Sequence, residues 1–252
     1  MTDRPTRVLF AGESWNTYAV HTKGANTYTT SGYEEGAKDL LAALQSSGFD
    51  ITYLRNHEAV ENFPYETREL AERFDAVVLS DIPADSLLLP HAVFVKGLKR
   101  PNRLRSLAAF VERGGGLLMV GGYMSFSGFE GRARYAMTPL APMLPVEIAA
   151  GDDRIEEPEG VNPVVTKDHA VLNGLPPNWP YFLGYNRFKA KPAAQVIMSV
   201  GDDPFLVVGR HGSGRAAAFA SDCSPHWGSP EFLAWAHYAK FWSQLTGWVA
   251  GR

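Results

Sequence analysis

Residues 101–122 read PNRLRSLAAFVERGGGLLMVGG, a helix pattern that runs directly into a strand pattern. Apolar side chains recur at helical spacing over 101–113, which predicts an amphipathic helix. These side chains are Leu104, Leu107, Ala108 and Val111. Three glycines then end the helix, and 117–122 is short and almost wholly apolar. Such a run is typical of a strand buried on both faces of a parallel sheet.

The same alternation extends toward the N-terminus. Apolar runs predict strands at 8–12, 50–54 and 76–81, and helical spacing predicts helices at 34–47 and 66–74. The polar stretch 13–33 is interpreted as a loop. The resulting order, β-α-β-α-β-α-β, predicts a parallel sheet with helices on both faces, joined by right-handed crossovers.

The second half of the sequence is less regular. Residues 123–145 are rich in loop-forming residues, and 152–160 is an acidic, polar surface segment. Further strands are expected at 195–200, 205–209 and 216–221, the last two joined by a turn at 212–214, followed by a helix over 230–246. No domain boundary is evident, so we expect one domain over residues 1–252.

Composition narrows the function classes. The net charge is −3 and the pI is near 6.2, so there is no basic surplus to favour nucleic acid as a partner. Residues 1–5 lack the apolar core of a signal peptide, and no run of about 18 apolar residues predicts a membrane span. A cytoplasmic protein is therefore expected.

Metal and cofactor motifs are missing from the sequence. The single cysteine, Cys223, cannot form an intrachain disulfide or a multi-cysteine zinc site, and the seven histidines show no HExxH pattern. Glycines 114–116 precede a strand, so they fit a helix C-cap and not a phosphate-binding loop. We therefore expect no metal and no cofactor.

Aromatic residues mark the C-terminal helix. They fall roughly at helical spacing and are interpreted first as core and second as a subunit interface, which would make a homo-oligomer possible. The set comprises Trp235, Tyr238, Phe241, Trp242 and Trp248.

Several segments carry a family resemblance. The stretches 114–122 and 209–222 resemble class I glutamine amidotransferase-like domains. A bacterial glutamine amidotransferase-like family is similar over nearly the whole chain, in Gly12-Glu13-Ser14-Trp15, residues 121–126, Leu144-Pro145-Val146, Gly184-Tyr185-Asn186 and residues 222–227. The resemblance implies an α/β, flavodoxin-like three-layer sandwich with a mostly parallel central sheet.

The resemblance also implies a site that this sequence does not reproduce. Class I glutaminases use a cysteine on a tight turn after a central strand, with a histidine backed by an acid. Here Tyr123 falls at the nucleophile position, with Gly122 as the neighbouring choice. Where the histidine should follow the late strand, Asp222 and Cys223 stand, and His226 comes later. The usual Cys-His-Glu triad is therefore not found, and canonical glutaminase activity is not expected.

Candidate site residues follow from the strand ends, because ligands of open parallel sheets bind beyond the carboxyl ends of the strands. The candidate catalytic residues are Cys223, His226, Asp222 and Glu13. The candidate ligand-binding residues are Ser14, Trp15, Asp81, Gly122, Tyr123, Ser125 and Trp227.

Each candidate has a structural alternative. Cys223 and His226 have the spacing of a thiol activated by an imidazole, or Cys223 is a buried small side chain and His226 caps a turn. Glu13 could be a general base or part of a structural ion pair. Asp222 could orient His226 or serve as a helix N-cap, and Ser125 could bind a ligand or form a turn.

Two functions stay open at this stage. In the first, the strand-end pocket binds a small polar metabolite and the protein hydrolyses it. In the second, the domain keeps the fold and the pocket, has lost the chemistry, and serves as a ligand-binding or scaffold module. A carbohydrate-related role, similar to that of trehalose-utilisation proteins, rests on fold analogy alone.

Overall fold

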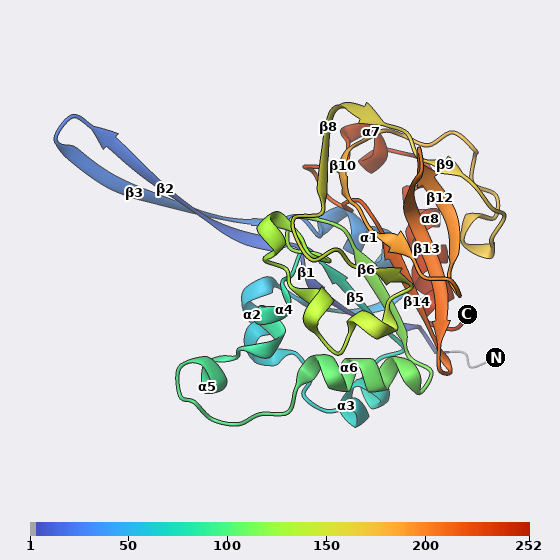
Figure 1. Cartoon of the computed structure of the whole chain (residues 1–252), viewed down its shortest axis with the longest axis horizontal. Coiled ribbons are helices and arrows are strands. Elements are labelled where there is room, and N and C mark those ends of the chain that lie inside the picture. The colour runs from blue at the N-terminus through green and yellow to red at the C-terminus, as the bar shows by residue number, and fades with distance from the viewer. Residues whose placement is uncertain (1–3) are drawn as a thin grey trace.

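The computed structural model describes residues 4–252, and an eight-stranded sheet forms its centre (Figure 1). Five parallel strands lie side by side: β4 (Asp50–Leu54), β1 (Arg7–Gly12), β5 (Ala76–Ser80), β6 (Gly116–Val120) and β14 (Gly214–Phe219). Three antiparallel strands extend the sheet beyond β14: β13 (Asp203–His211), β12 (Gln195–Val200) and β9 (Val164–Val165). The mostly parallel sheet predicted from the sequence is confirmed.

The strand order reverses its direction of winding between β1 and β5. From β1 the chain passes to β4 on one side, then returns to β5 on the other side and continues outward. The order of the parallel strands is therefore the flavodoxin-like one, in which ligands bind where the direction of winding reverses. Residues Gly12 and Ser80 face each other at the carboxyl ends of β1 and β5, and they mark this point.

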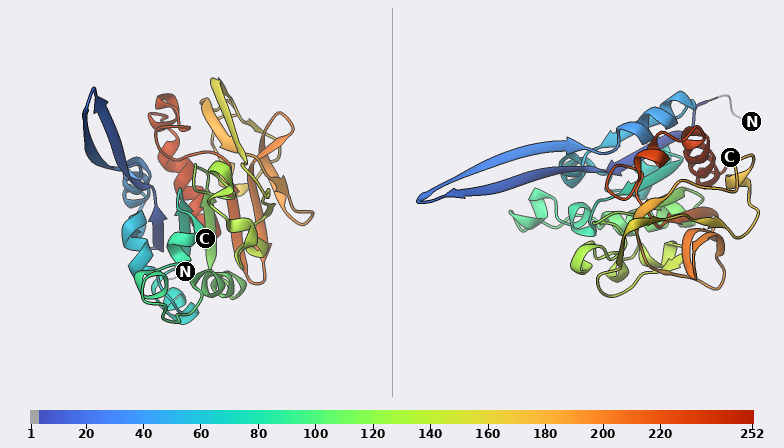
Figure 2. Two further views of the ribbon diagram at one scale, coloured as in Figure 1. Left: turned by 60° about the vertical axis from the view of Figure 1, so that its left-hand side comes forward. Right: turned by 90° about the horizontal axis from the view of Figure 1, so that it is seen from above.

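Helices cover both faces of the sheet, as Figure 2 shows from above. Helix α8 (Tyr238–Val249) contacts β14, β6 and β5 and packs against α1 (Lys38–Ser46). The other face carries α2 (Asn56–Asn62), α3 (Thr67–Arg73), α4 (Ala84–Leu88) and α6 (Arg103–Glu112). This arrangement confirms the three-layer α/β class.

Burial explains why these strands occupy the centre. Every residue of β5 and β6 is buried, as expected for strands covered on both faces. On α8, Phe241 and Trp242 are fully buried and pack with ring centroids 5.6 and 5.1 Å from Phe219 of β14. The aromatic side chains at these two positions therefore belong to the core.

One sequence interpretation is wrong: residues 13–33 are not a loop. They form a long hairpin of β2 (Ser14–Lys23) and β3 (Asn26–Glu35), which we call the arm and which extends away from the body (Figure 1). The arm is rich in Thr and Tyr, which favour strands. Gly24, with φ +60°, opens the two-residue turn at its tip, where a positive φ suits a tight hairpin.

The second half differs in detail from expectation. The predicted helix over 230–246 is two helices, α7 (Pro230–Leu233) and α8, separated by a short turn. The acidic segment contains β8 (Arg154–Val161), which pairs with β10 (Phe182–Asn186). The smaller elements are α5 (His91–Phe94), β7 (Val146–Glu147), β11 (Lys189–Ala190) and the 3-10 turns Phe129–Gly131, Tyr135–Met137, Ala141–Met143 and Ala170–Leu172.

Within residues 4–252, no helix combines the length and the apolar character that a membrane crossing requires.

Candidate functional site

Three carboxylates stand at the carboxyl ends of parallel strands. Glu13 follows β1, Asp81 follows β5 and Asp222 lies just beyond β14. Glu13 and Asp81 both have left-handed backbone, with φ of 53° and 44°. Such conformations cost free energy in residues other than glycine, and they cluster at functional sites. Because the strand order reverses between β1 and β5, two of the three carboxylates stand at the reversal point.

Glu13 is buried and held by hydroxyl groups. Its side chain accepts hydrogen bonds from Ser80 Oγ at 2.5 Å and Ser224 Oγ at 2.8 Å, and Cys223 Sγ lies 3.7 Å from its Oε2. Only 1% of Glu13 is exposed. Burial, and after it the charge of Asp81, raise the pKa of Glu13 to about 7 against the opposing effect of the hydroxyl and thiol hydrogen bonds. A carboxyl group with this pKa can accept or release a proton near neutral pH.

Asp222 shares a hydroxyl partner with Glu13. Its Oδ1 accepts hydrogen bonds from the backbone N–H of Ser224 at 2.9 Å and from Ser224 Oγ at 3.0 Å. The pKa of Asp222 is well above the usual aspartate value, first because of burial and then because of the charges of Glu13 and Asp81. One hydroxyl carries one proton and cannot donate to both carboxylates at once. The contact is therefore best satisfied when one of the two carboxyl groups is protonated.

Asp81 is half-buried and is the most accessible of the three carboxylates. Its Oδ1 accepts a hydrogen bond from the backbone N–H of Met124 at 2.6 Å, and its own N–H donates to Ser125 Oγ at 3.1 Å. Burial raises the pKa of Asp81, opposed by the hydrogen bond from Met124. At Gly122, whose φ is +143°, an added Cβ would lie 2.8 Å from Asp81 Oδ1. Glycine at this position lets the loop after β6 approach the carboxylate.

The loop after β6 does not form the strand-to-helix turn of a nucleophile elbow, because residues 121–128 have no helix among them. Tyr123 stands at the elbow position, and its hydroxyl donates to Glu156 Oε1 at 2.8 Å. Burial raises the pKa of Tyr123, and the contact with Glu156 raises it further. The phenol therefore remains protonated and is a poor nucleophile at neutral pH.

An aromatic wall stands beside the carboxylates, formed by Tyr123, His226 and Trp227. The Tyr123 ring packs edge-to-face on His226 with centroids 4.5 Å apart, and His226 stacks on Trp227 at 5.5 Å. Trp227 Nε1 donates to Glu156 Oε2 at 3.0 Å, and the Arg154 guanidinium lies 4.4 Å from the Tyr123 ring centroid. Trp227, a predicted ligand-binding residue, is only 1% exposed and lies at the back of the wall, whereas Tyr123 is half-buried and His226 is exposed. The rings of Tyr123 and His226 are therefore the part of the wall that suits a polar ligand with an apolar face.

The structure does not form the Cys223–His226 pair that the sequence spacing suggests. Cys223 Sγ lies 3.5 Å from Ser80 Oγ and near Glu13, whereas the His226 ring belongs to the aromatic wall. Over residues 4–252 no hydrogen bond joins His226 to Cys223 or to Asp222. Burial raises the pKa of the Cys223 thiol well above its usual value, and the neighbouring carboxylates raise it further. This is opposite to the shift that activates a nucleophilic cysteine.

Two predicted ligand-binding residues lie at the start of the arm. Ser14 is buried, and its Oγ accepts a hydrogen bond from the backbone N–H of Asn56 at 2.9 Å, at the first residue of α2. Trp15 is 36% exposed on the arm. The structure thus uses the Ser14 side chain to hold α2 and leaves Trp15 at the surface.

Several polar partners were missed in the sequence. Ser80 and Ser224, which hold Glu13, are small uncharged residues with no distinctive spacing. Asn186 is fully buried: its Oδ1 accepts from the Gly122 N–H at 2.9 Å, and its Nδ2 donates to Asp153 Oδ1 at 2.9 Å. Asn186 therefore fixes the loop that carries Tyr123. The sequence held one signal for Asn186: it belongs to the Gly184-Tyr185-Asn186 segment, which is part of the family resemblance.

Three side chains of the buried group have atoms that can coordinate a metal ion: ligand atoms of Glu13, Asp222 and Cys223 lie within 4.8 Å of one another. The Ser80 and Ser224 hydroxyls already bond to the Glu13 oxygens, so the Glu13 carboxylate is satisfied by hydroxyl groups.

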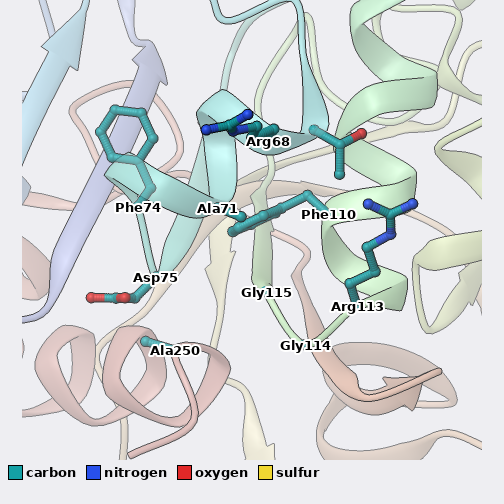
Figure 3. Close-up of a pocket in the computed structure, with 10 residues that line it drawn as sticks. Arg68, Ala71, Phe74, Asp75, Phe110, Arg113, Gly114, Gly115 and Ala250 are labelled. Atoms are coloured by element: carbon teal, nitrogen blue, oxygen red, sulfur yellow. The ribbon is translucent and has the colours of Figure 1, made fainter.

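A cavity of about 530 Å³ lies at the opposite ends of the strands from the carboxylates (Figure 3). Asp75 of its lining precedes β5, and Gly115 precedes β6. The cavity is thus at the amino ends of the strands, where doubly wound sheets do not place their ligands. The candidate site is therefore the carboxyl-end group.

Fold and site together define a protein of the class I glutamine amidotransferase-like fold without the catalytic cysteine of glutaminases. The chain belongs to the family described as "Putative glutamine amidotransferase", whose model matches residues 7–251. None of the curated proteins compared with the chain matches it.

Two solved structures are similar along the whole chain. The cytoplasmic protein STM3548 of Salmonella typhimurium is 43% identical with a TM-score of 0.93, covering 96% of this chain and 98% of that one. The cytoplasmic protein STM1381 of Salmonella typhimurium LT2 is 43% identical with a TM-score of 0.94, covering 97% and 99%. A ThuA-like protein from Bacteroides uniformis is 13% identical with a TM-score of 0.55, covering 96% and 93%, and shares the fold alone.

The state of Cys223 gives a direct test of the nucleophile hypothesis. Because the side chain is fully buried and its pKa is raised, we expect iodoacetamide to modify the folded protein more slowly than a free model thiol at pH 7. Mass spectrometry of timed samples measures this rate, and the same protein in guanidinium chloride is the control that should react fully. Labelling faster than the free thiol would restore Cys223 as a nucleophile.

Proposed function

We propose that the protein has a crevice at the carboxyl ends of β1 and β5, binds a small polar metabolite there and hydrolyses it by general acid–base chemistry. The observation that carries this proposal is Glu13, whose pKa of about 7 lies where proton transfer is most useful at physiological pH. Its position at the reversal point of the strand order supports the same location.

The residues around the crevice suit distinct roles. Asp81, the most accessible of the three carboxylates, is the group we assign to ligand binding, with the aromatic wall as its neighbouring surface. Glu13 is the general base, and the Ser224 hydroxyl between Glu13 and Asp222 offers a route for its proton. Because neither Tyr123 nor Cys223 is an activated nucleophile, the proposed reaction is direct attack by water without a covalent intermediate.

A second function is favoured by one specific observation. Glu13 is 1% exposed, and its oxygens bond to protein hydroxyls. If these contacts persist when ligand is bound, the carboxyl group is structural and the protein is a binding module without turnover.

The test uses three proteins and a panel of polar metabolites that includes sugars, amides and nucleosides. Thermal shift and calorimetry identify ligands, and mass spectrometry detects hydrolysis products. Asp81→Asn should weaken binding by at least about tenfold, because hydrogen bonds to a charged group contribute about 1.5–3 kcal/mol. Glu13→Gln should keep binding within a few-fold but slow turnover by about 100-fold or more.

The outcomes separate the two functions. Binding by the wild-type protein without any product supports the binding module. If no ligand depends on Asp81, the crevice is not the site. L-Glutamine is one member of the panel, and it should release no ammonia above background. Ammonia release from L-glutamine would mean that the assignment of Tyr123 to the nucleophile position is wrong.

The cellular location is part of the proposal. The two Salmonella relatives, each 43% identical, are described as cytoplasmic proteins. We propose the same compartment for this chain, where a lone reduced cysteine is ordinary.

A further inference from the structure

The arm is exposed over nearly its whole length. Every residue of β3 is exposed, and in β2 only Ser14, at the base, is buried. Figures 1 and 2 show both strands extending beyond the body, without a third strand or a helix against their outer part. A two-stranded hairpin in water is marginally stable at best. A ribbon of this length is therefore expected to pack against another surface.

The arm lacks the features that protect free strand edges. Its register runs without a bulge from Ser14 opposite Glu35 to Lys23 opposite Asn26. Its strands contain no proline and only three residues with full charges, Lys23 at the tip and Glu34 and Glu35 at the base. Natural sheet edges are usually protected by charges, prolines or bulges against pairing with other chains. Because charges, prolines and bulges are scarce in the arm, we expect its edges to be covered by another surface.

One face of the arm offers apolar contact. Tyr18 and Val20 lie on the same face, since alternate residues of a strand share a side, and they are 77% and 69% exposed. On the opposite face, by contrast, Tyr28 stacks on His21 with ring centroids 4.8 Å apart. The uncovered apolar surface is therefore centred on Tyr18 and Val20, near the middle of β2.

We propose that the arm is an interface with a second copy of this chain, in which the free edge of β2 pairs antiparallel with β2 of the second copy across a two-fold axis. Tyr18 and Val20 of the two copies then lie side by side near the axis, on one face of the joined ribbon.

The charges of the arm are self-complementary in this arrangement. An antiparallel edge pairing puts the tip of each arm against the base of the other. Glu34 is opposite Trp15, which shares a side of β2 with Lys23, so Lys23 and Glu34 both lie on the face that does not carry Tyr18 and Val20. Edge pairing keeps this face common to both copies, and Lys23 of one copy then meets Glu34 of the other. Within residues 4–252, Glu34 forms no salt bridge, whereas Glu35 is paired with Arg55 at 2.6 Å. The base thus has an acidic group available for the Lys23 of a second copy. Two such contacts form in each pair because of the symmetry.

Light scattering coupled to gel filtration tests the proposal with the whole protein. The wild type should be a dimer at about 10 μM. A variant in which residues 17–32 are replaced by Asn-Gly, joining the cross-strand partners Asn16 and Tyr33, should be a monomer with an unchanged melting curve by circular dichroism. Tyr18→Asp combined with Val20→Asp should also give a monomer. Phe94→Asp is the matched control, since Phe94 is 74% exposed away from the arm, and this variant should remain a dimer.

Charge reversal tests the tip-to-base arrangement. Lys23→Glu should raise the dimer dissociation constant by about tenfold, since two attractions become two repulsions, and adding Glu34→Lys should restore it. A monomeric wild type at 100 μM, or a dimer after the arm is shortened, would overturn the proposal. Failure of Glu34→Lys to rescue Lys23→Glu would overturn the antiparallel arrangement. An assembly with another protein and no dimer would identify a different partner.

Discussion

The variant Glu13→Gln is expected to raise the free energy of unfolding by about 3 kcal/mol at pH 8, and by less than about 1 kcal/mol at pH 5. In the folded protein the pKa of Glu13 is raised from 4.5 to about 7, first by burial and then by the charge of Asp81. Each pKa unit corresponds to about 1.4 kcal/mol, so the shift represents roughly 3 kcal/mol. Glutamine carries no charge to bury, and its amide can still bond to the Ser80 and Ser224 hydroxyls.

The direction follows from proton linkage. A folded state with a raised carboxyl pKa binds the proton more tightly than the unfolded chain. The stability from this group is present below pH 4.5 and is lost as the pH rises to about 7. Asp75 behaves oppositely: burial would raise its pKa, but Arg4 and Arg7 hold it at about 2. Its contribution is lost only in stronger acid, so it does not affect this window.

Urea unfolding followed by tryptophan fluorescence between pH 5 and pH 8 measures the effect. Glu159→Gln, at an exposed position of β8, is the control and should leave stability unchanged. Some pH dependence should remain in Glu13→Gln, since Asp81 and Asp222 also have raised pKa values. An effect of equal size at every pH would mean that Glu13 has an ordinary carboxyl pKa in the folded protein.

Gly12→Ala is expected to cost at least about 4 kcal/mol of stability or to prevent folding. Gly12 ends β1 with φ +119°, and an added Cβ would lie 1.8 Å from the backbone oxygen of Ser80. That oxygen also accepts the N–H of Glu13 at 2.9 Å. The clash is with the backbone of a fully buried strand, which cannot move without breaking the sheet. Losses of this size come from few mechanisms, and backbone overlap in a core is one of them.

Gly48→Ala separates the clash from backbone strain. Gly48 has φ +82°, but an added Cβ would have nothing within 4 Å. It should therefore cost only about 1–2 kcal/mol, the penalty for left-handed backbone. Chemical denaturation of both variants measures the difference. Equal losses would show that the closeness of β1 and β5 is not what requires glycine at position 12.

The parallel part of the fold could be predicted because its signals are local. Fully apolar runs gave β1, β5 and β6, and helical spacing gave α6. The arm could not be predicted from polarity, because its strands are exposed on both faces and so lack the alternation of apolar and polar residues, although Thr and Tyr favour strands. The break between α7 and α8 was hidden by aromatic residues that are continuous across the turn. Local polarity thus predicted the elements that the core buries and missed those that solvent surrounds.

The candidate site was predictable to the level of strand ends. That rule brought Glu13, Asp222 and Cys223 to one place, as the structure shows. It could not give the direction of side chains on loops: His226, with φ 117°, turns to the aromatic wall. Nor could it identify Ser80 and Ser224, because hydroxyl residues are too common for their roles to be visible in one sequence.

The sheet order also has a consequence for how the chain emerges from the ribosome. Strand β6 pairs with β5 on one side, but its other neighbour, β14, begins roughly 90 residues later. At translation rates of about 5–20 residues per second, the apolar edge of β6 waits roughly 5–20 seconds for its partner. During that interval the nascent N-terminal half exposes an unpaired central strand, which is the kind of surface that chaperones recognise. Glu13 and Asp222 come from opposite ends of the sequence. The cluster of three carboxylates is therefore complete only when synthesis is almost finished.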